Sequence, residues 1–151
     1  MEVFIVSMAD DNGMTTEGPT AVDRSVLARR GVVALVLGVL VNLALAFVLL
    51  ELDVPRSTEF FQYGPIVFWT TLGVFGATVV YYFVTQRSRT PNRTFARIAL
   101  GVLVLSFLPD VALAVFVDAV TTSEAVALMS LHVPPAAICI VTLTGWVAWG
   151  R

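Results

Sequence analysis

The chain has 151 residues, of which 58% are hydrophobic and 13% are charged, and its formal net charge is −2. Its mean hydropathy of +0.87 lies outside the range of ordinary soluble domains, which excludes a water-soluble globular protein. The length leaves room for four membrane spans with short connections and for no separate soluble domain.

Residues 1–23 are predicted to form a disordered, acidic N-terminal tail. Five acidic residues and no basic residue occur in this segment, and glycine and proline interrupt it. Such a composition buries too little apolar surface to fold by itself. We therefore assign the membrane domain to residues 24–151.

Four apolar runs follow the tail, at about residues 32–52, 65–84, 98–117 and 125–146. Each contains about 20 residues, and a helix of that length crosses a hydrocarbon core of about 30 Å. The first run is longer than the apolar region of a signal peptide, and no small-x-small cleavage site follows it, so we expect an uncleaved span. Short connections make neighbouring spans antiparallel. The sequence thus predicts an all-α membrane protein, a four-transmembrane-helix up-down-up-down bundle in the lipid bilayer.

The three connections carry local signals for turns and helix starts. In the first, Ser57-Thr58-Glu59 resembles a helix start and predicts a short interfacial helix. The second, at 86–97, is polar and basic, and its Thr90-Pro91-Asn92 predicts a turn. In the third, Thr122 or Ser123 is expected to cap the fourth span.

The arginines predict the orientation of the bundle. Three precede the first run and four lie between the second and third runs, whereas the other two connections hold Arg56 alone among several acidic residues. Both basic segments lie on one side only if all four runs cross the membrane. The positive-inside rule then places the N-terminus and the C-terminus in the cytoplasm, with the protein in the cell membrane. The seven clustered residues are Arg24, Arg29, Arg30, Arg87, Arg89, Arg93 and Arg97.

An acid and a histidine lie deep inside the apolar runs, Asp110 in the third and His132 in the fourth. Along straight helices, each lies about 12 Å from the outer end of its run. Asn42 in the first run and Thr71 in the second, next to Thr70, fall in the same outer half. Ionisable groups in hydrocarbon cost several kcal/mol unless they are paired or hydrated. The sequence therefore predicts a polar intramembrane site of Asp110 and His132, supported by Asn42 and Thr71.

Prolines lie in the same layer, at Pro109, Pro134 and Pro135. Each removes a backbone hydrogen bond within its helix and frees a carbonyl that needs another partner. Together with the Asp and the His, they suggest a hydrated pocket open to the outside. Two other interpretations stay open: the pair only holds helices together, or it forms a contact within an oligomer.

The sequence argues against most catalytic and cofactor chemistry. No Walker, G-x-G-x-x-G or H-E-x-x-H motif is present. One histidine cannot supply two axial haem ligands, and a zinc site needs about three protein ligands. The single cysteine, Cys139, excludes a C-x-x-C redox centre. We therefore expect no enzyme, no cofactor, no metal and no nucleic-acid partner; a homo-oligomer or a larger membrane complex remains open.

Several short motifs resemble those of an uncharacterised family of small four-helix membrane proteins from halophilic archaea and actinobacteria. The resemblance covers about residues 24–149 and implies the fold and a haloarchaeal source, but no activity. It rests on Asn42, Tyr63-Gly64-Pro65, Pro91-Asn92-Arg93-Thr94-Phe95, Ser106-Phe107-Leu108-Pro109-Asp110 and Met129-Ser130-Leu131-His132.

The leading functional hypothesis is a membrane protein that binds or passes a proton or a small polar solute. Asp110 would bear the charge, and His132 would be its pH-sensitive partner. The alternative is a structural or interaction subunit of a membrane complex, in which the polar layer only fixes the helices.

Overall fold

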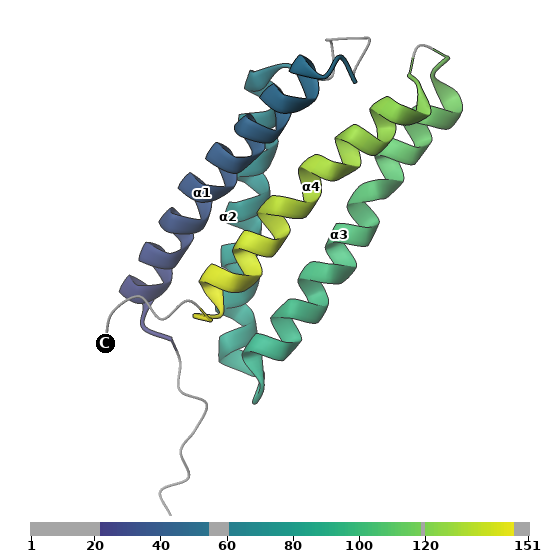
Figure 1. Ribbon diagram of the computed structural model, residues 1–151. Helices are drawn as coiled ribbons and strands as arrows, with labels where there is room; N and C mark the ends of the chain where they lie inside the picture. Colours follow the sequence, from purple (N-terminus) through teal and green to yellow (C-terminus); the bar gives the residue numbers. More distant parts are fainter. Residues whose placement is uncertain (1–21, 55–60, 119, 147–151) are drawn as a thin grey trace, which may run out of the picture.

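A computed structural model describes residues 22–54, 61–118 and 120–146. The described chain consists of four helices, α1 (Arg24–Glu51), α2 (Tyr63–Arg87), α3 (Pro91–Phe116) and α4 (Thr122–Leu143) (Figure 1). By length and composition, all four are able to cross a membrane. The predicted all-α four-helix bundle is confirmed.

The helices run alternately up and down (Figure 1). α2 and α4 each contact the three other helices, whereas α1 and α3 do not touch. The start of α1, the α2–α3 turn and the end of α4 lie together. We call this the basic end, because it carries the seven clustered arginines. The end with the α1–α2 and α3–α4 connections is the opposite end.

Two helices begin well before the predicted apolar runs at the basic end. α1 begins at Arg24 rather than at residue 32, and α3 begins at Pro91 rather than at residue 98. The predicted polar connection at 86–97 therefore shrinks to residues 88–90. Hydropathy shows where a helix enters hydrocarbon, whereas helix propensity and capping decide where it begins.

The helix caps explain these starts. Asp23 caps α1, and its carboxylate accepts a hydrogen bond of 2.8 Å from the Ser25 backbone N–H, which lowers the pKa of the carboxyl. α4 is capped by Thr121 rather than by Thr122 or Ser123, because Thr121 and Glu124 form a reciprocal capping box. α4 also ends at Leu143, before the predicted residue 146.

Two predictions fall outside the described residues. They are the disordered tail, which concerns residues 1–21 of the predicted segment, and the interfacial helix at Ser57-Thr58-Glu59.

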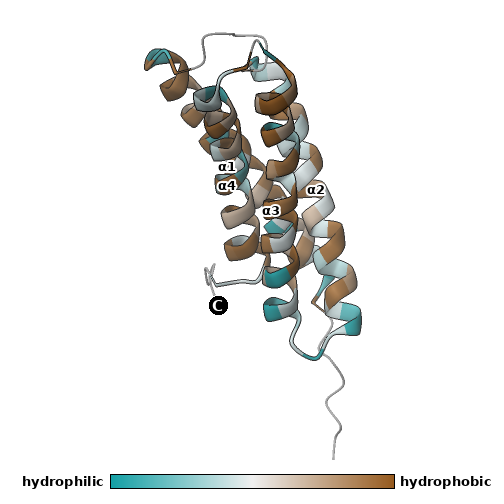
Figure 2. Cartoon of the chain, turned by 90° about the vertical axis from the view of Figure 1, so that its right-hand side faces the viewer, coloured by the Kyte–Doolittle hydropathy of each residue, from teal (hydrophilic) through white to brown (hydrophobic). Residues whose placement is uncertain are grey.

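The side-chain distribution is that of a protein in lipid. Figure 2 shows hydrophobic residues along the length of the helices and hydrophilic ones gathered near the helix ends. Large apolar side chains cover the outside, among them Phe75 at 67% and Phe116 at 82% exposure. On α3 the buried residues are Phe95 and Asp110. A carboxylate is thus buried on the helix that otherwise faces outward.

The buried core has two parts. The first, at the basic end, gathers side chains from all four helices around Tyr81 and Phe95. The second, at the opposite end, gathers around Ala46 and Leu131. Gly38 of α1 is buried between them, against Thr70, Val74 and Pro135. These contacts set the depth and rotation of the polar groups described next.

Candidate functional site

A carboxylate and an imidazole face each other between α3 and α4. The Nδ1 atom of His132 lies 3.5 Å from Oδ2 of Asp110. The same nitrogen lies 3.0 Å from the carbonyl oxygen of Leu128, one turn earlier on α4. The Asp110 side chain is 8% exposed, whereas the His132 side chain is 40% exposed. The carboxylate is therefore inside the bundle, and the imidazole connects it to the surface.

The local geometry of α3 and α4 positions this pair. Phe107 and Asp110 are three residues apart and so share one face of α3. The Phe107 ring lies edge-on to the His132 ring, with centroids 6.3 Å apart and an angle of 87°. The imidazole is thus held between a backbone carbonyl of its own helix and two side chains of α3.

The pair is incompletely hydrogen-bonded. Within the described residues, Oδ2 of Asp110 is one of two buried side-chain oxygens that lack a hydrogen-bond partner. A buried polar atom without a partner costs about 1–3 kcal/mol, and more if it is charged. Asp110 therefore has a strong physical reason to take up a proton, a water molecule or a small polar solute.

The charge states of the pair explain why it would bind and release a single proton. In an apolar setting, two coupled groups exchange protons as one unit. The pair is electrically neutral when it holds one proton in all, on the carboxyl or as an imidazolium beside a carboxylate. Loss of that proton leaves a net negative charge, and a further proton makes the pair positive. Hydrocarbon disfavours both charged states.

A second polar pair lies between α1 and α2. The Nδ2 group of Asn42 donates a hydrogen bond of 2.9 Å to Oγ1 of Thr70. Asn42 is 3% exposed, and its Oδ1 is the other buried oxygen without a partner among the described residues. Thr71 instead donates to the carbonyl of Val67 on its own helix, at 2.7 Å. Adjacent helical residues point about 100° apart, so only one of the two threonines faces α1.

The four predicted site residues therefore do not form one continuous polar site. Asp110 and His132 meet, Asn42 meets Thr70, and Thr71 meets neither. Among the described residues, no hydrogen bond or ion pair joins the two polar pairs. The two pairs stay separate although α1 packs against α4, because Asn42 turns toward α2 and His132 turns toward α3.

A polar cluster at the basic end was missed from the sequence. Arg30 of α1 donates to the carbonyl of Leu143 at 3.0 Å, and Asn92 of α3 donates to the carbonyl of Thr144 at 3.2 Å. The hydroxyl of Tyr81 donates to Oδ1 of Asn92 at 2.8 Å. The cluster thus joins all four helices where α4 ends. Its sequence signal was Asn92 beside a helix-starting proline, but its partners are distant in the chain.

Replacing Gly145 with alanine should weaken this cluster. Gly145 has a φ of 74°, in the left-handed region that disfavours side chains. A Cβ at this position would lie 2.6 Å from Nη2 of Arg30 and would displace the guanidinium from the Leu143 carbonyl. We expect the free energy of unfolding to fall by about 2–3 kcal/mol, from backbone strain and the lost hydrogen bond. Denaturant titration of the purified protein in detergent measures this loss.

The control for this prediction is the same substitution in an Arg30→Gln background. The contact is already absent there, so Gly145→Ala should cost only the share due to backbone strain. Equal losses in the two backgrounds would contradict the proposed displacement of Arg30.

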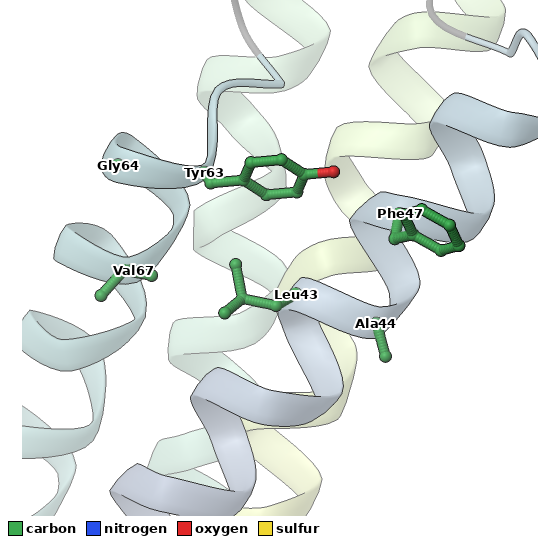
Figure 3. Close-up of a pocket in the computed structure, with 6 residues that line it drawn as sticks. All are labelled: Leu43, Ala44, Phe47, Tyr63, Gly64 and Val67. Atoms are coloured by element: carbon green, nitrogen blue, oxygen red, sulfur yellow. The ribbon is translucent and has the colours of Figure 1, made fainter.

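Other candidate sites offer less chemistry. Among the described residues, no three His, Cys, Asp or Glu side chains gather in a way that could hold a metal ion. Near the opposite end, a shallow groove between α1 and α2 is lined by Leu43, Ala44, Phe47, Tyr63, Gly64 and Val67. Figure 3 shows the Tyr63 ring projecting from the start of α2 toward α1. The groove is almost wholly apolar, and Asp110 and His132 do not line it.

The chain belongs to a family of unknown function (DUF6069), whose model matches residues 22–148. The predicted membership of an uncharacterised family is thereby confirmed, over nearly the predicted range. The source among halophilic archaea and actinobacteria stays a prediction. No curated protein and no solved structure matches the chain.

Proposed function

We propose that this member of the family is a multi-pass protein of the cell membrane that binds or passes a proton or a small polar solute at Asp110 and His132. The observation that carries the proposal is the buried carboxylate, whose Oδ2 has no hydrogen-bond partner and lies 3.5 Å from a partly exposed imidazole. The function is non-enzymatic. It needs no catalytic motif and no cofactor, because binding and release of a proton complete the cycle.

The orientation of the bundle in the membrane would determine which side the Asp110–His132 pair faces. The seven arginines at the basic end favour cytoplasmic placement of that end, and with it both termini. Asp110 lies six residues before the end of α3 at Phe116, near the opposite end. The pair would thus exchange protons or solute with the outer side. Labelling of single cysteines introduced at Ser57 and Thr90 tests this, because they should react from opposite sides of the membrane.

Each side chain has a distinct role in this proposal. Asp110 bears the charge, since it is the buried acid. His132 passes protons between Asp110 and the surroundings, since its side chain is 40% exposed and its Nδ1 lies 3.5 Å from the carboxylate. Asn42 and Thr70 position α1 against α2, and Thr71 has no direct part in the pair.

A structural or interaction subunit is the second candidate function. It is favoured by the burial pattern of α3, where Phe95 and Asp110 are the buried residues. In that role, Asp110 and His132 would only hold α3 against α4. Hydrogen bonds between membrane helices average about 0.6 kcal/mol, so such a contact is modest.

Proton uptake by reconstituted protein separates the two candidates. The purified chain is placed in liposomes that contain a pH-sensitive dye, and the outer pH is stepped. We expect Asp110→Asn to reduce uptake to the level of empty liposomes, because an amide cannot exchange the proton. His132→Gln should slow uptake, because it removes the ring nitrogen that faces Asp110.

The matched control is Ser106→Ala on the same helix. The Ser106 hydroxyl donates to the carbonyl of Leu103 at 2.7 Å and takes no part in the pair. This variant should retain wild-type uptake, and all variants should keep the helical circular dichroism of the wild type. If the wild type shows no uptake while Asp110→Asn lowers thermal stability, the structural role is favoured and the proton site is wrong.

A further inference from the structure

We propose that a groove between α1 and α2, which runs from the middle of the bundle toward the basic end, binds an anionic phospholipid, with an acyl chain in the groove and the phosphate at Arg24. The inference requires the proposed membrane location, but it does not depend on proton binding by Asp110 and His132. It rests on the shape and chemistry of the groove, on the cation that closes it and on the distribution of charge along the bundle.

The groove has a volume of about 380 Å³ and a wholly apolar character. Its residues include Ala28, Val32 and Leu35 of α1 and Phe68, Leu72 and Phe75 of α2. Two threonines also line it, but the hydroxyls of Thr71 and Thr78 donate to the carbonyls of Val67 and Val74 on their own helix. With those donors already occupied, the groove presents a hydrocarbon surface that suits an acyl chain.

Close helix packing forms the floor of the groove. A Cβ at Gly31 would lie 3.1 Å from Cγ2 of Thr78, so the two helices approach closely at this point. Small residues at such crossings are common in membrane proteins. The larger side chains on either side of the crossing then stand out as the walls of the groove.

A cation closes the groove at the basic end. Arg24 precedes Ala28 by four residues and Tyr82 follows Thr78 by four, so both lie one helical turn beyond the groove. The Arg24 guanidinium lies 5.8 Å from the centroid of the Tyr82 ring. Among the described residues, no carboxylate lies within ion-pair distance of Arg24. The nearest acid in sequence, Asp23, accepts the Ser25 N–H instead.

A second arginine extends this arrangement. The Tyr82 ring lies edge-on to the Phe83 ring at 5.6 Å, and the Arg87 guanidinium lies 5.9 Å from the Phe83 centroid. Arginine beside tyrosine or phenylalanine at a helix end is typical of the headgroup level of a membrane. The two guanidinium groups supply positive charge there, where the phosphate of a lipid in the groove would lie.

The distribution of charged residues favours a lipid over a second copy of the chain as the occupant of the groove. Copies with the same orientation in a membrane would bring their basic ends together, and the arginines would repel each other. One described acid, the α1 cap Asp23, lies at the basic end among seven arginines, whereas Glu51, Asp53, Asp118 and Glu124 lie at the opposite end. An anionic phospholipid instead has an apolar chain that would lie in the groove and a negative phosphate at the end of that chain, where Arg24 lies.

Native mass spectrometry of the full chain in detergent tests the charge requirement. Phosphatidylglycerol and phosphatidylcholine with identical acyl chains are the two probes, and the wild type should bind more of the first. Arg24→Gln should weaken phosphatidylglycerol binding about fivefold, as expected for one basic residue near a membrane surface. Arg29→Gln is the matched control, because it removes the same charge from the next arginine of α1; it should retain wild-type binding.

Filling the groove tests the acyl-chain requirement. Ala28→Phe should reduce the binding of both lipids, whereas Ala137→Phe, on an exposed face of α4, should leave it unchanged. Circular dichroism checks the folding of each variant, and Asp110→Asn should bind lipid normally. Equal effects of Arg24→Gln and Arg29→Gln, or full binding by Ala28→Phe, would overturn the proposal. So would a dimer that Ala28→Phe dissociates without a change in bound lipid.

Discussion

Truncation of Tyr81 to alanine is expected to destabilise the bundle severely. Tyr81 is 1% exposed in the core at the basic end, and its ring lies edge-on to Phe95 with centroids 5.0 Å apart. Its hydroxyl also holds Asn92, which donates to the Thr144 carbonyl. Alanine would leave a cavity between α2 and α3. It would also remove the hydroxyl that donates a hydrogen bond to Asn92 in the cluster that joins all four helices.

The size of the effect follows from packing. Truncation of a buried aromatic residue costs about 3–5 kcal/mol in soluble cores. In a bilayer, the share due to exclusion of water is absent, since the separated helices face lipid rather than water. The lost contacts and the lost hydrogen bond remain. We therefore expect the free energy of unfolding to fall by at least about 2 kcal/mol.

Denaturant titration with two control variants tests this expectation. Tyr81→Phe keeps the ring and loses only the hydroxyl, so it should cost about 0.5–1.5 kcal/mol. Tyr63→Ala removes a tyrosine that is 48% exposed on the same helix and should cost much less. If Tyr81→Ala is no more destabilising than Tyr63→Ala, the basic-end cluster does not stabilise the bundle.

Replacement of Gly38 by leucine is also expected to destabilise the bundle. A Cβ at Gly38 would lie 3.6 Å from Cγ2 of Val74, 3.7 Å from Cγ2 of Thr70 and 4.0 Å from Cβ of Pro135. These are ordinary van der Waals distances, so a methyl group fits. The further carbons of leucine would meet α2 and α4 and would force α1 outward, at a cost of about 1–3 kcal/mol.

The pattern over three substitutions distinguishes overpacking from a general effect of glycine. Gly38→Ala should be neutral or slightly stabilising, because alanine favours the helix by up to about 1 kcal/mol. Gly101→Leu on α3 should also be tolerated, because nothing lies within 4 Å of a Cβ there. Equal stability of Gly38→Leu and Gly101→Leu in the same titration would contradict the close approach of α1 to α2 and α4.

Overpacking at Gly38 should also disturb the Asn42–Thr70 hydrogen bond, which lies one turn farther along α1. The Asp110–His132 pair joins α3 to α4 and shares no helix with that bond. Gly38→Leu should therefore destabilise the protein while the remaining folded fraction keeps its proton uptake.

Hydropathy and length alone determined the number of helices and the general fold. Each run has the length that a bilayer requires, and this depends on residues near one another in the chain. The same information placed Asp110 and His132 at similar depths, because helical rise converts residue number directly into distance. It misplaced the starts of α1 and α3, since the polar residues there form helix outside the apolar runs.

Only the tertiary structure decided which polar groups meet. The four helices are apolar around most of their circumference, so the sequence does not indicate which face of each helix turns inward. Rotation of α2 selects Thr70 rather than Thr71 for Asn42, and the packing of α4 against α3 brings His132 to Asp110. The Tyr81 cluster likewise needs four segments that are distant in sequence. Side-chain pairing depends on helix rotation and packing order, and these are fixed by close contacts such as that at Gly38 rather than by hydropathy.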